Sequence, residues 1–214
     1  MNRKNLRSLA AGVALLMAVG ALAGCGGEKK ADDSKKMVTV GIAQLVEHGA
    51  LDAANKGFVA GMASKGFKEN ENVKYDRQNA QADQSNLQNI AQRFVSNKVD
   101  LICAIATPTA QTMANATKDI PIVATAVTDY EVAKLAASNN EPKGNVTGTS
   151  DMNPIDQQLE LLLKIAPQTK NIGTVYSSSE VNSQLQVDVL KKLAGDKGIN
   201  VIEATVSTVN DIHQ

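Results

Sequence analysis

The regular alternation of short β-branched runs with segments of helical periodicity restricts the fold of this chain more than any other feature. Between the runs, apolar residues recur at spacings of three and four, as Leu87, Ile90 and Phe94 do. Strands that alternate with helices in this way are typical of βαβ units, and they predict an α/β fold with a parallel sheet covered on both faces. The predicted strands are residues 38–43, 73–78, 101–106, 121–127, 171–176 and 200–206.

The first 24 residues have the layout of a secretory signal peptide. A basic segment ends at Arg7, and an uncharged, mostly apolar run continues from there to Ala23. This run is shorter than the ~20 residues that a membrane-spanning helix needs, so we expect residues 1–24 to be removed. The polar residues 25–36 then form a flexible tether.

Charge, cysteine content and histidine content argue against several kinds of site. Without the first 24 residues the chain has 19 basic and 22 acidic residues, a net charge of −3, and no nucleic-acid partner is expected. Cys103 lies in an apolar run, and with Cys25 at the predicted cleavage site it lacks a disulfide partner, which predicts a buried, unreactive thiol. His48 and His213 are far apart and have no clustered carboxylates or cysteines, so we expect no metal site.

No sequence motif of a nucleotide cofactor or of a catalytic nucleophile occurs. The chain lacks G-x-G-x-x-G, G-x-x-x-x-G-K-[ST] and G-x-S-x-G. These are the signatures of dinucleotide binding, phosphate binding and the nucleophile elbow of hydrolases. We therefore expect no cofactor, and we expect that the protein is not an enzyme.

A change of composition divides the chain. Residues 139–154 are rich in Asn, Gly and Pro, which indicates a boundary between an N-terminal lobe, residues 37–150, and a second lobe, residues 151–214. Beyond the boundary only two strands are predicted, too few to bury a proper core. We therefore expect the second lobe to be incomplete and truncated, with exposed apolar faces.

Ligands of open parallel α/β sheets bind beyond the carboxyl ends of the strands, so the loop A-I-A-T-P-T-A-Q is a candidate site. Thr107 is predicted to cap a helix whose first position is Pro108. The backbone N–H groups of Thr109 and Ala110 would then be free to bind a carboxylate or a phosphate. A purely structural cap is an equally good interpretation.

The loop after the fourth predicted strand also leaves two interpretations open. Asp129 could bind a ligand ammonium group, or it could cap and solvate a turn. Tyr130 could stack on a ligand, or it could only close the rim of the pocket.

Several stretches resemble one known family. Leu22-Ala23-Gly24-Cys25 resembles the lipobox of bacterial lipoproteins, in which the cysteine is lipidated. From about residue 38 to the last residue, the chain is similar to lipid-anchored substrate-binding proteins of ABC transporters with a type I periplasmic-binding fold. The similar stretches are V-G-I-A-Q-L-V-E-H-G-A-L-D-A-A, D-L-I-C-A-I-A-T-P-T-A-Q, D-I-P-I-V-A-T-A-V-T-D, N-V-T-G-T-S-D-M and V-Y-S-S-S-E-V-N-S.

The resemblance implies two Rossmann-like lobes joined by a hinge, with a small-molecule ligand held between them. The ligand would be an amino acid, with aromatic amino acids a possibility in this family, and a membrane permease would receive it. A lipid anchor on Cys25 would hold the protein at the outer face of the bacterial cell membrane.

The resemblance also implies a set of ligand-binding residues. Helix N–H groups and Thr107 would hold the ligand carboxylate, and one of Asp129, Glu47 or Glu180 would accept its ammonium group. Which of the three does so stays open, and Tyr130 stands where proline is expected from relatives. The full set is Gln44, Glu47, Thr107, Ala110, Thr125 and Asp129 from the first lobe, with Tyr176, Glu180, Asn182 and Ser183 from the second.

Three alternatives to an importer of amino acids have less support. A ligand-sensing regulator would share the fold, but repressors of this kind carry a DNA-binding helix pair where this chain has a signal and a tether. A sugar-binding member is disfavoured because the chain has no Trp and only 3% aromatic residues, whereas sugar sites usually stack rings on aromatic faces. An enzyme lacks any supporting motif.

Overall fold

The computed structural model describes residues 37–142, 144–207 and 211–212. The predicted signal peptide, the tether, Cys25 and His213 lie outside the described residues. Within them, none of the helices is both long enough and apolar enough to cross a bilayer.

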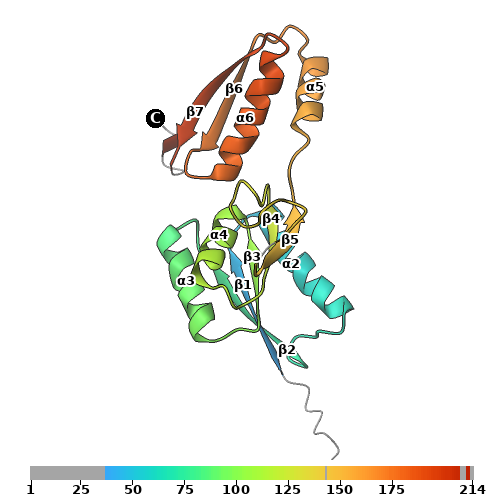
Figure 1. The fold of residues 1–214 in the computed structure, drawn as a ribbon. Helices are drawn as coiled ribbons and strands as arrows, with labels where there is room; N and C mark the ends of the chain where they lie inside the picture. Colours follow the sequence, from blue (N-terminus) through green and yellow to red (C-terminus); the bar gives the residue numbers. More distant parts are fainter. Residues whose placement is uncertain (1–36, 143, 208–210, 213–214) are drawn as a thin grey trace, which may run out of the picture. The chain divides into compact units, whose positions relative to one another are not determined.

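A five-stranded parallel sheet forms the first lobe, in the order β2-β1-β3-β4-β5 (Figure 1). Four of its strands confirm the predicted ones to within one or two residues. The strands are β1 (Val38–Gln44), β2 (Val73–Asn79), β3 (Leu101–Ile105), β4 (Ile122–Val127) and β5 (Val146–Ser150). The helices are α2 (Gly49–Ser64), α3 (Gln84–Ser96) and α4 (Thr107–Ala116).

Strand β5 was not predicted. It lies inside the Asn-, Gly- and Pro-rich segment that we interpreted only as a boundary, and it pairs in parallel with β4. Val146 is its one buried residue, so the strand has no apolar periodicity that a sequence pattern would reveal.

Helices cover both faces of this sheet, with α2 on one face and α3 and α4 on the other (Figure 1). Successive strand residues alternate between the two faces. Ile42 and Cys103 pack with α2, whereas Ile102 packs with the α3 and α4 side chains. The thiol of Cys103 is free and fully buried, which confirms the expected buried cysteine, and burial raises its pKa to about 12.

Gly41 in β1 allows α3 to approach the sheet closely. A Cβ atom at this position would lie 2.7 Å from the nearest ring atom of Phe94. Phe94 is fully buried in the core on this face. The glycine is therefore needed for close packing rather than for an unusual backbone conformation.

The second lobe contains α5 (Ile155–Ile165), β6 (Asn171–Ser177), α6 (Val181–Gly195) and β7 (Asn200–Val206). Its two strands pair in parallel, as predicted. Leu159 and Ala194 form the centre of a small core on one face of this sheet. The other face carries Val175 and Ile202, which are 64% and 56% exposed, so the expected exposed apolar face is present.

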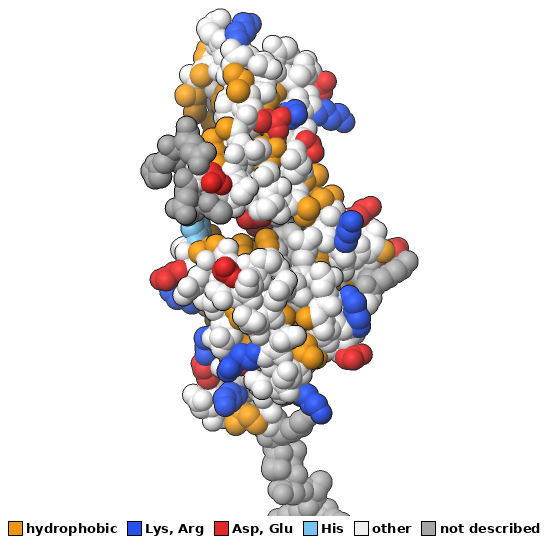
Figure 2. Space-filling model, turned by 90° about the vertical axis from the view of Figure 1, so that its left-hand side faces the viewer, with side chains coloured by type: hydrophobic (Ala, Val, Ile, Leu, Met, Phe, Trp, Pro, Cys, Tyr) orange, Lys and Arg blue, Asp and Glu red, His pale blue; other side chains and the backbone are white. Residues whose placement is uncertain are grey.

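Charged side chains of both signs are interspersed over the surface seen in Figure 2. The hydrophobic side chains on the same face lie among them in small groups. Nothing on this face resembles a continuous patch of one charge.

Candidate functional site

The start of α4 lies directly after β3, at the carboxyl end of the sheet. Ala106 is the residue before the helix, with φ +86° and ψ 153°, a conformation that favours glycine. Its N–H donates to the Thr125 carbonyl at 3.0 Å, and its own carbonyl accepts the N–H of Ala110 at 3.0 Å. The strained residue therefore fixes the place where the helix begins.

This geometry corrects two details of the predicted site. Thr107 is the first helical residue and not the cap, and Pro108 is the second. The N–H of Ala110 is already used within the helix. The first-turn N–H groups of Thr107 and Thr109 have no carbonyl four residues earlier in the helix to receive them.

Two hydroxyl groups in this first turn are buried without a partner. Thr107 is 2% exposed and Thr109 is fully buried, and neither Oγ1 atom has a hydrogen-bond partner among the described residues. A buried unsatisfied hydroxyl costs about 1–3 kcal/mol, so such groups usually bind a ligand or an ordered water. Together with the positive end of the helix, they make a site suited to an anion.

Gln44 does not offer its side chain to a ligand in this structure. Its Nε2 donates to Asp52 Oδ1 at 2.6 Å and to the Val46 carbonyl at 2.9 Å. Its Oε1 accepts a hydrogen bond from Asn55 Nδ2 at 3.1 Å. The amide thus ties the end of β1 to α2. Sequence analysis did not identify Asp52 or Asn55, although both lie on the helix that follows Gln44.

Glu47 lies exposed in the loop between β1 and α2. The loop ends at His48, the residue before α2, whose Nδ1 accepts the N–H of Ala50 at 3.3 Å. His48 therefore has a structural use as a helix cap.

Asp129 and Tyr130 both serve the structure of their loop. The Asp129 Oδ1 accepts the N–H of Val132 at 2.8 Å, and its Oδ2 accepts a hydrogen bond from Asn139 Nδ2 at 2.8 Å. This is the turn-capping role. Tyr130 is only 6% exposed and its ring belongs to the core, so it is not available to stack on a ligand. Thr125 is half-buried on β4, and its Oγ1 accepts a hydrogen bond from Thr149 Oγ1 at 3.3 Å.

The four predicted residues of the second lobe lie close together, at the carboxyl end of β6 and the start of α6. Glu180 immediately precedes α6, and its Oε2 accepts a weak hydrogen bond from Asn182 Nδ2 at 3.3 Å. The Asn182 Oδ1 is buried without a partner among the described residues. Ser183 is half-buried, and its N–H donates to the Glu180 carbonyl at 3.1 Å.

Tyr176 takes part in an internal network in the same lobe. Its hydroxyl lies 2.9 Å from Gln184 Oε1 and 2.8 Å from Glu203 Oε2, and its single proton can satisfy only one of them. The hydrogen bond to Glu203 raises the pKa of Tyr176, and the Lys191 ammonium lowers the pKa of Glu203.

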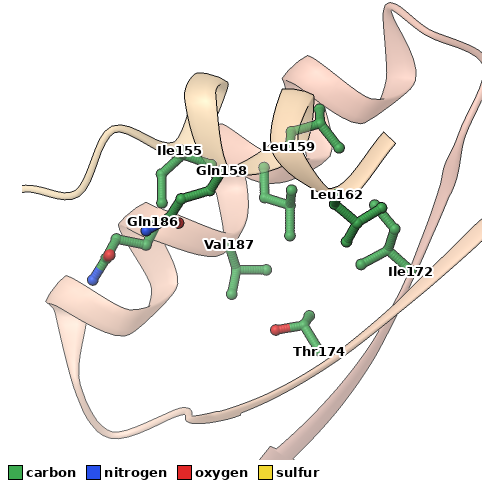
Figure 3. A pocket seen from close by; sticks show the side chains of 9 residues that line it. Ile155, Gln158, Leu159, Leu162, Ile172, Thr174, Gln186 and Val187 are labelled. Atoms are coloured by element: carbon green, nitrogen blue, oxygen red, sulfur yellow. The ribbon is translucent and has the colours of Figure 1, made fainter. Parts of the chain in front are cut away.

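An apolar pocket of about 250 Å³ lies between α5, α6 and β6 (Figure 3). Leu159, Leu162 and Val187 point into it, and Gln158 and Gln186 are at its edge. None of the predicted ligand-binding residues and no charged side chain lines this pocket. Its place on the face of the sheet, away from the strand ends, makes it a packing gap between helices and not the candidate site.

Metal binding finds no support in the part of the chain that the structure describes. No group of three or more His, Cys, Asp or Glu side chains is placed there to hold an ion.

Comparisons with known proteins agree on one family. Residues 39–214 match the family model described as ABC transporter substrate binding protein. The tyrosine-binding protein of Clostridioides difficile is 47% identical over 221 residues, an alignment that covers 100% of this chain and 63% of the relative.

Two solved structures are similar in both fold and sequence. A conserved domain protein from Vibrio cholerae superposes with a TM-score of 0.81 at 42% identity. The ABC domain in complex with L-Trp from Streptococcus pneumonia superposes with a TM-score of 0.80, also at 42% identity. Each match covers 83% of this chain and 60% of the solved one, so the chain spans less than two thirds of the length of these relatives.

Proposed function

Because this chain belongs to the family of ABC transporter substrate binding proteins, we propose that it is the solute-binding component of an ABC importer with an aromatic amino acid as its ligand. The likeness to solved substrate-binding proteins confirms the type I periplasmic-binding fold. The ligand class is proposed for the full-length protein, since the chain spans only part of its relatives. One relative is a tyrosine-binding protein and another was solved with L-Trp.

The first turn of α4 is the observation that carries this proposal. The first turn of α4 has two N–H groups without an intrahelical acceptor, and the buried hydroxyls of Thr107 and Thr109 have no hydrogen-bond partner among the described residues. A carboxylate accepts several hydrogen bonds at once, and charged hydrogen bonds are stronger than neutral ones. A ligand carboxylate therefore fits both the charge and the unsatisfied donors.

An acidic side chain binds the ligand ammonium group in this proposal, and the three candidates differ in their present partners. Both Asp129 oxygens already accept one hydrogen bond, although a carboxylate has capacity for more. Glu47 lies exposed in its loop, and Glu180 receives one weak hydrogen bond. The acid that binds the ammonium stays one of these three.

The remaining predicted residues divide by role. In the second lobe, the Asn182 Oδ1 has no hydrogen-bond partner among the described residues and is proposed as a ligand acceptor, with Tyr176 and Ser183 in the same group. In the first lobe, we propose that Ala110 and Thr125 support the start of α4 from behind and beside it, and that Gln44 acts by fixing the loop between β1 and α2.

Export and anchoring belong to the same proposal. Residues 1–24 direct export, Cys25 carries the lipid, and residues 25–36 tether a first lobe, residues 37–150, and a second, residues 151–214. The protein then stays at the outer face of the cell membrane and delivers its ligand to a permease.

A series of related ligands tests the carboxylate site directly. Calorimetry of the full-length protein with L-tryptophan should show binding, and tryptamine, which lacks the carboxylate, should bind at least about 100-fold more weakly if two or more charged hydrogen bonds are lost. Indole-3-propionate keeps the carboxylate and lacks the ammonium group, so its affinity shows how much each of the two groups contributes to binding. Equal affinity for tryptamine and L-tryptophan would contradict the proposed role of α4.

A further inference from the structure

Strand β4 contains a bulge next to the candidate site. Ala124 pairs with Gly148 and Val127 pairs with Ser150, so two residues of β4 lie opposite the single residue Thr149 of β5. Bulges are rare between parallel strands and are over-represented beside functional sites, where they change the direction of the chain. One of these two β4 residues, Ala126, has a φ of +55°.

The bulge is connected to the start of α4 by one hydrogen bond. The Thr125 carbonyl, which lies in the bulge, accepts the N–H of Ala106 at 3.0 Å. Ala106 has the strained conformation that begins the helix. A shift of the bulge would therefore move the first turn of α4, with its buried hydroxyls.

Tyr130 holds the two strands together at this bulge. Its hydroxyl donates to the Ala124 carbonyl at 2.9 Å and lies 3.2 Å from the Thr149 carbonyl, so it contacts one carbonyl from each strand. Burial, together with the nearby charge of Asp151, raises the pKa of Tyr130 to about 12, so the hydroxyl remains a donor at neutral pH. The backbone N–H of Tyr130 donates to Asn139 Oδ1 at 2.7 Å, which fixes the residue itself.

Gly148 leaves the space that this arrangement needs. A Cβ atom at position 148 would overlap both the Tyr130 hydroxyl and the Ala124 carbonyl oxygen. Tyr130 and Gly148 therefore act as a pair, although they are far apart in the sequence.

We propose that Tyr130 is a positioning residue for ligand binding, whose hydroxyl fixes the β4 bulge and, through the Thr125 carbonyl and Ala106, the first turn of α4. This inference rests on the proposed function, in which that turn binds the ligand carboxylate. Tyr130 itself stays in the core and does not touch the ligand.

Tyr130→Phe removes only the hydroxyl and tests the proposal in two ways. Calorimetry of the full-length protein with L-tryptophan should show an affinity about tenfold lower, the size expected for the loss of one oriented hydrogen bond. In the ligand-free protein, hydrogen exchange of the Ala106 amide should become faster, while amides in β1 should keep their rates. An effect on stability alone would change all slowly exchanging amides together.

Tyr75→Phe is the matched control, because the Tyr75 hydroxyl is buried in β2 and has no hydrogen-bond partner in the part of the chain that the structure describes. This variant should leave both the affinity and the Ala106 exchange rate unchanged.

The outcomes separate the inference from the proposed function. If Tyr130→Phe leaves the exchange of Ala106 unchanged, the positioning role is wrong, whatever the ligand. If the unaltered protein binds neither L-tryptophan nor L-tyrosine, the proposed ligand class is wrong, and the exchange measurement still decides whether Tyr130 holds the start of α4.

Discussion

The buried hydroxyl of Thr109 predicts that one substitution will raise stability and lower affinity at the same time. Thr109 is fully buried, and its Oγ1 has no hydrogen-bond partner among the described residues. Valine has the same shape and a similar helix propensity, so Thr109→Val removes the hydroxyl without leaving a cavity. The change should stabilise the ligand-free protein by about 1–3 kcal/mol, the usual cost of a buried unsatisfied polar group.

The same variant should bind its ligand less well. In the proposed complex the hydroxyl donates to the ligand carboxylate, and a hydrogen bond to a charged group contributes about 1.5–3 kcal/mol, which corresponds to roughly 10–150-fold in affinity. Urea denaturation of the ligand-free protein measures the first effect, and calorimetry with L-tryptophan measures the second.

Thr112→Val provides a control on the same helix. The Thr112 hydroxyl donates to the Pro108 carbonyl at 2.9 Å and accepts a hydrogen bond from Gln84 Nε2 at 3.1 Å, so its loss should destabilise the protein by about 1 kcal/mol. If Thr109→Val also destabilises the ligand-free protein and leaves affinity unchanged, the Thr109 hydroxyl is satisfied by water and the proposed anion site loses its main support.

Three further predictions concern packing and anchoring. Gly41→Ala should destabilise the first lobe by about 1–3 kcal/mol in denaturant titrations, because the new methyl group would displace the Phe94 ring. Val175→Thr should change stability by less than about 0.5 kcal/mol, since Val175 is 64% exposed; a larger loss would show that another part of the protein covers it. Cys25→Ser should move the protein from the membrane fraction to the soluble fraction, and retention after a salt wash would argue against a lipid anchor.

The fold was largely predictable because its signals are local. Strands β1 and β3 carry runs of buried apolar residues, β2 and β4 bury apolar residues at intervals, and α3 buries Leu87, Ile90 and Phe94 at regular helical spacing. The strand that was missed has only Val146 buried and contains Gly148, which is there for the Tyr130 hydroxyl and not for strand propensity. A sequence pattern does not identify a glycine, such as Gly148, that is required only because a distant side chain occupies the space beside it.

The candidate site was predictable only in its location, because its details depend on contacts between distant segments. Thr107 has the sequence context of a helix cap, yet the helix begins one residue earlier than a capping Thr107 would allow, since Ala106 is held by the Thr125 carbonyl of the neighbouring strand. Likewise, the Gln44 amide is occupied by Asp52 and Asn55, which approach it only after α2 has packed on the sheet.

Polar residues near the ends of the strands therefore either hold a loop in place or offer a hydrogen-bonding group to a ligand. The sequence alone does not distinguish these two roles. Gln44 uses both ends of its amide within the protein, and each Asp129 oxygen accepts one hydrogen bond in its loop, so both residues hold loops in place. Thr107 and Thr109 keep buried donors unsatisfied, at a cost in stability that only a bound ligand or water can offset. Groups that hydrogen-bond within the protein make the site rigid. A rigid site keeps the unsatisfied donors in position before a ligand binds. The division of these residues into supporting and binding groups follows from their hydrogen-bond partners, which the folded structure supplies and the residue types do not.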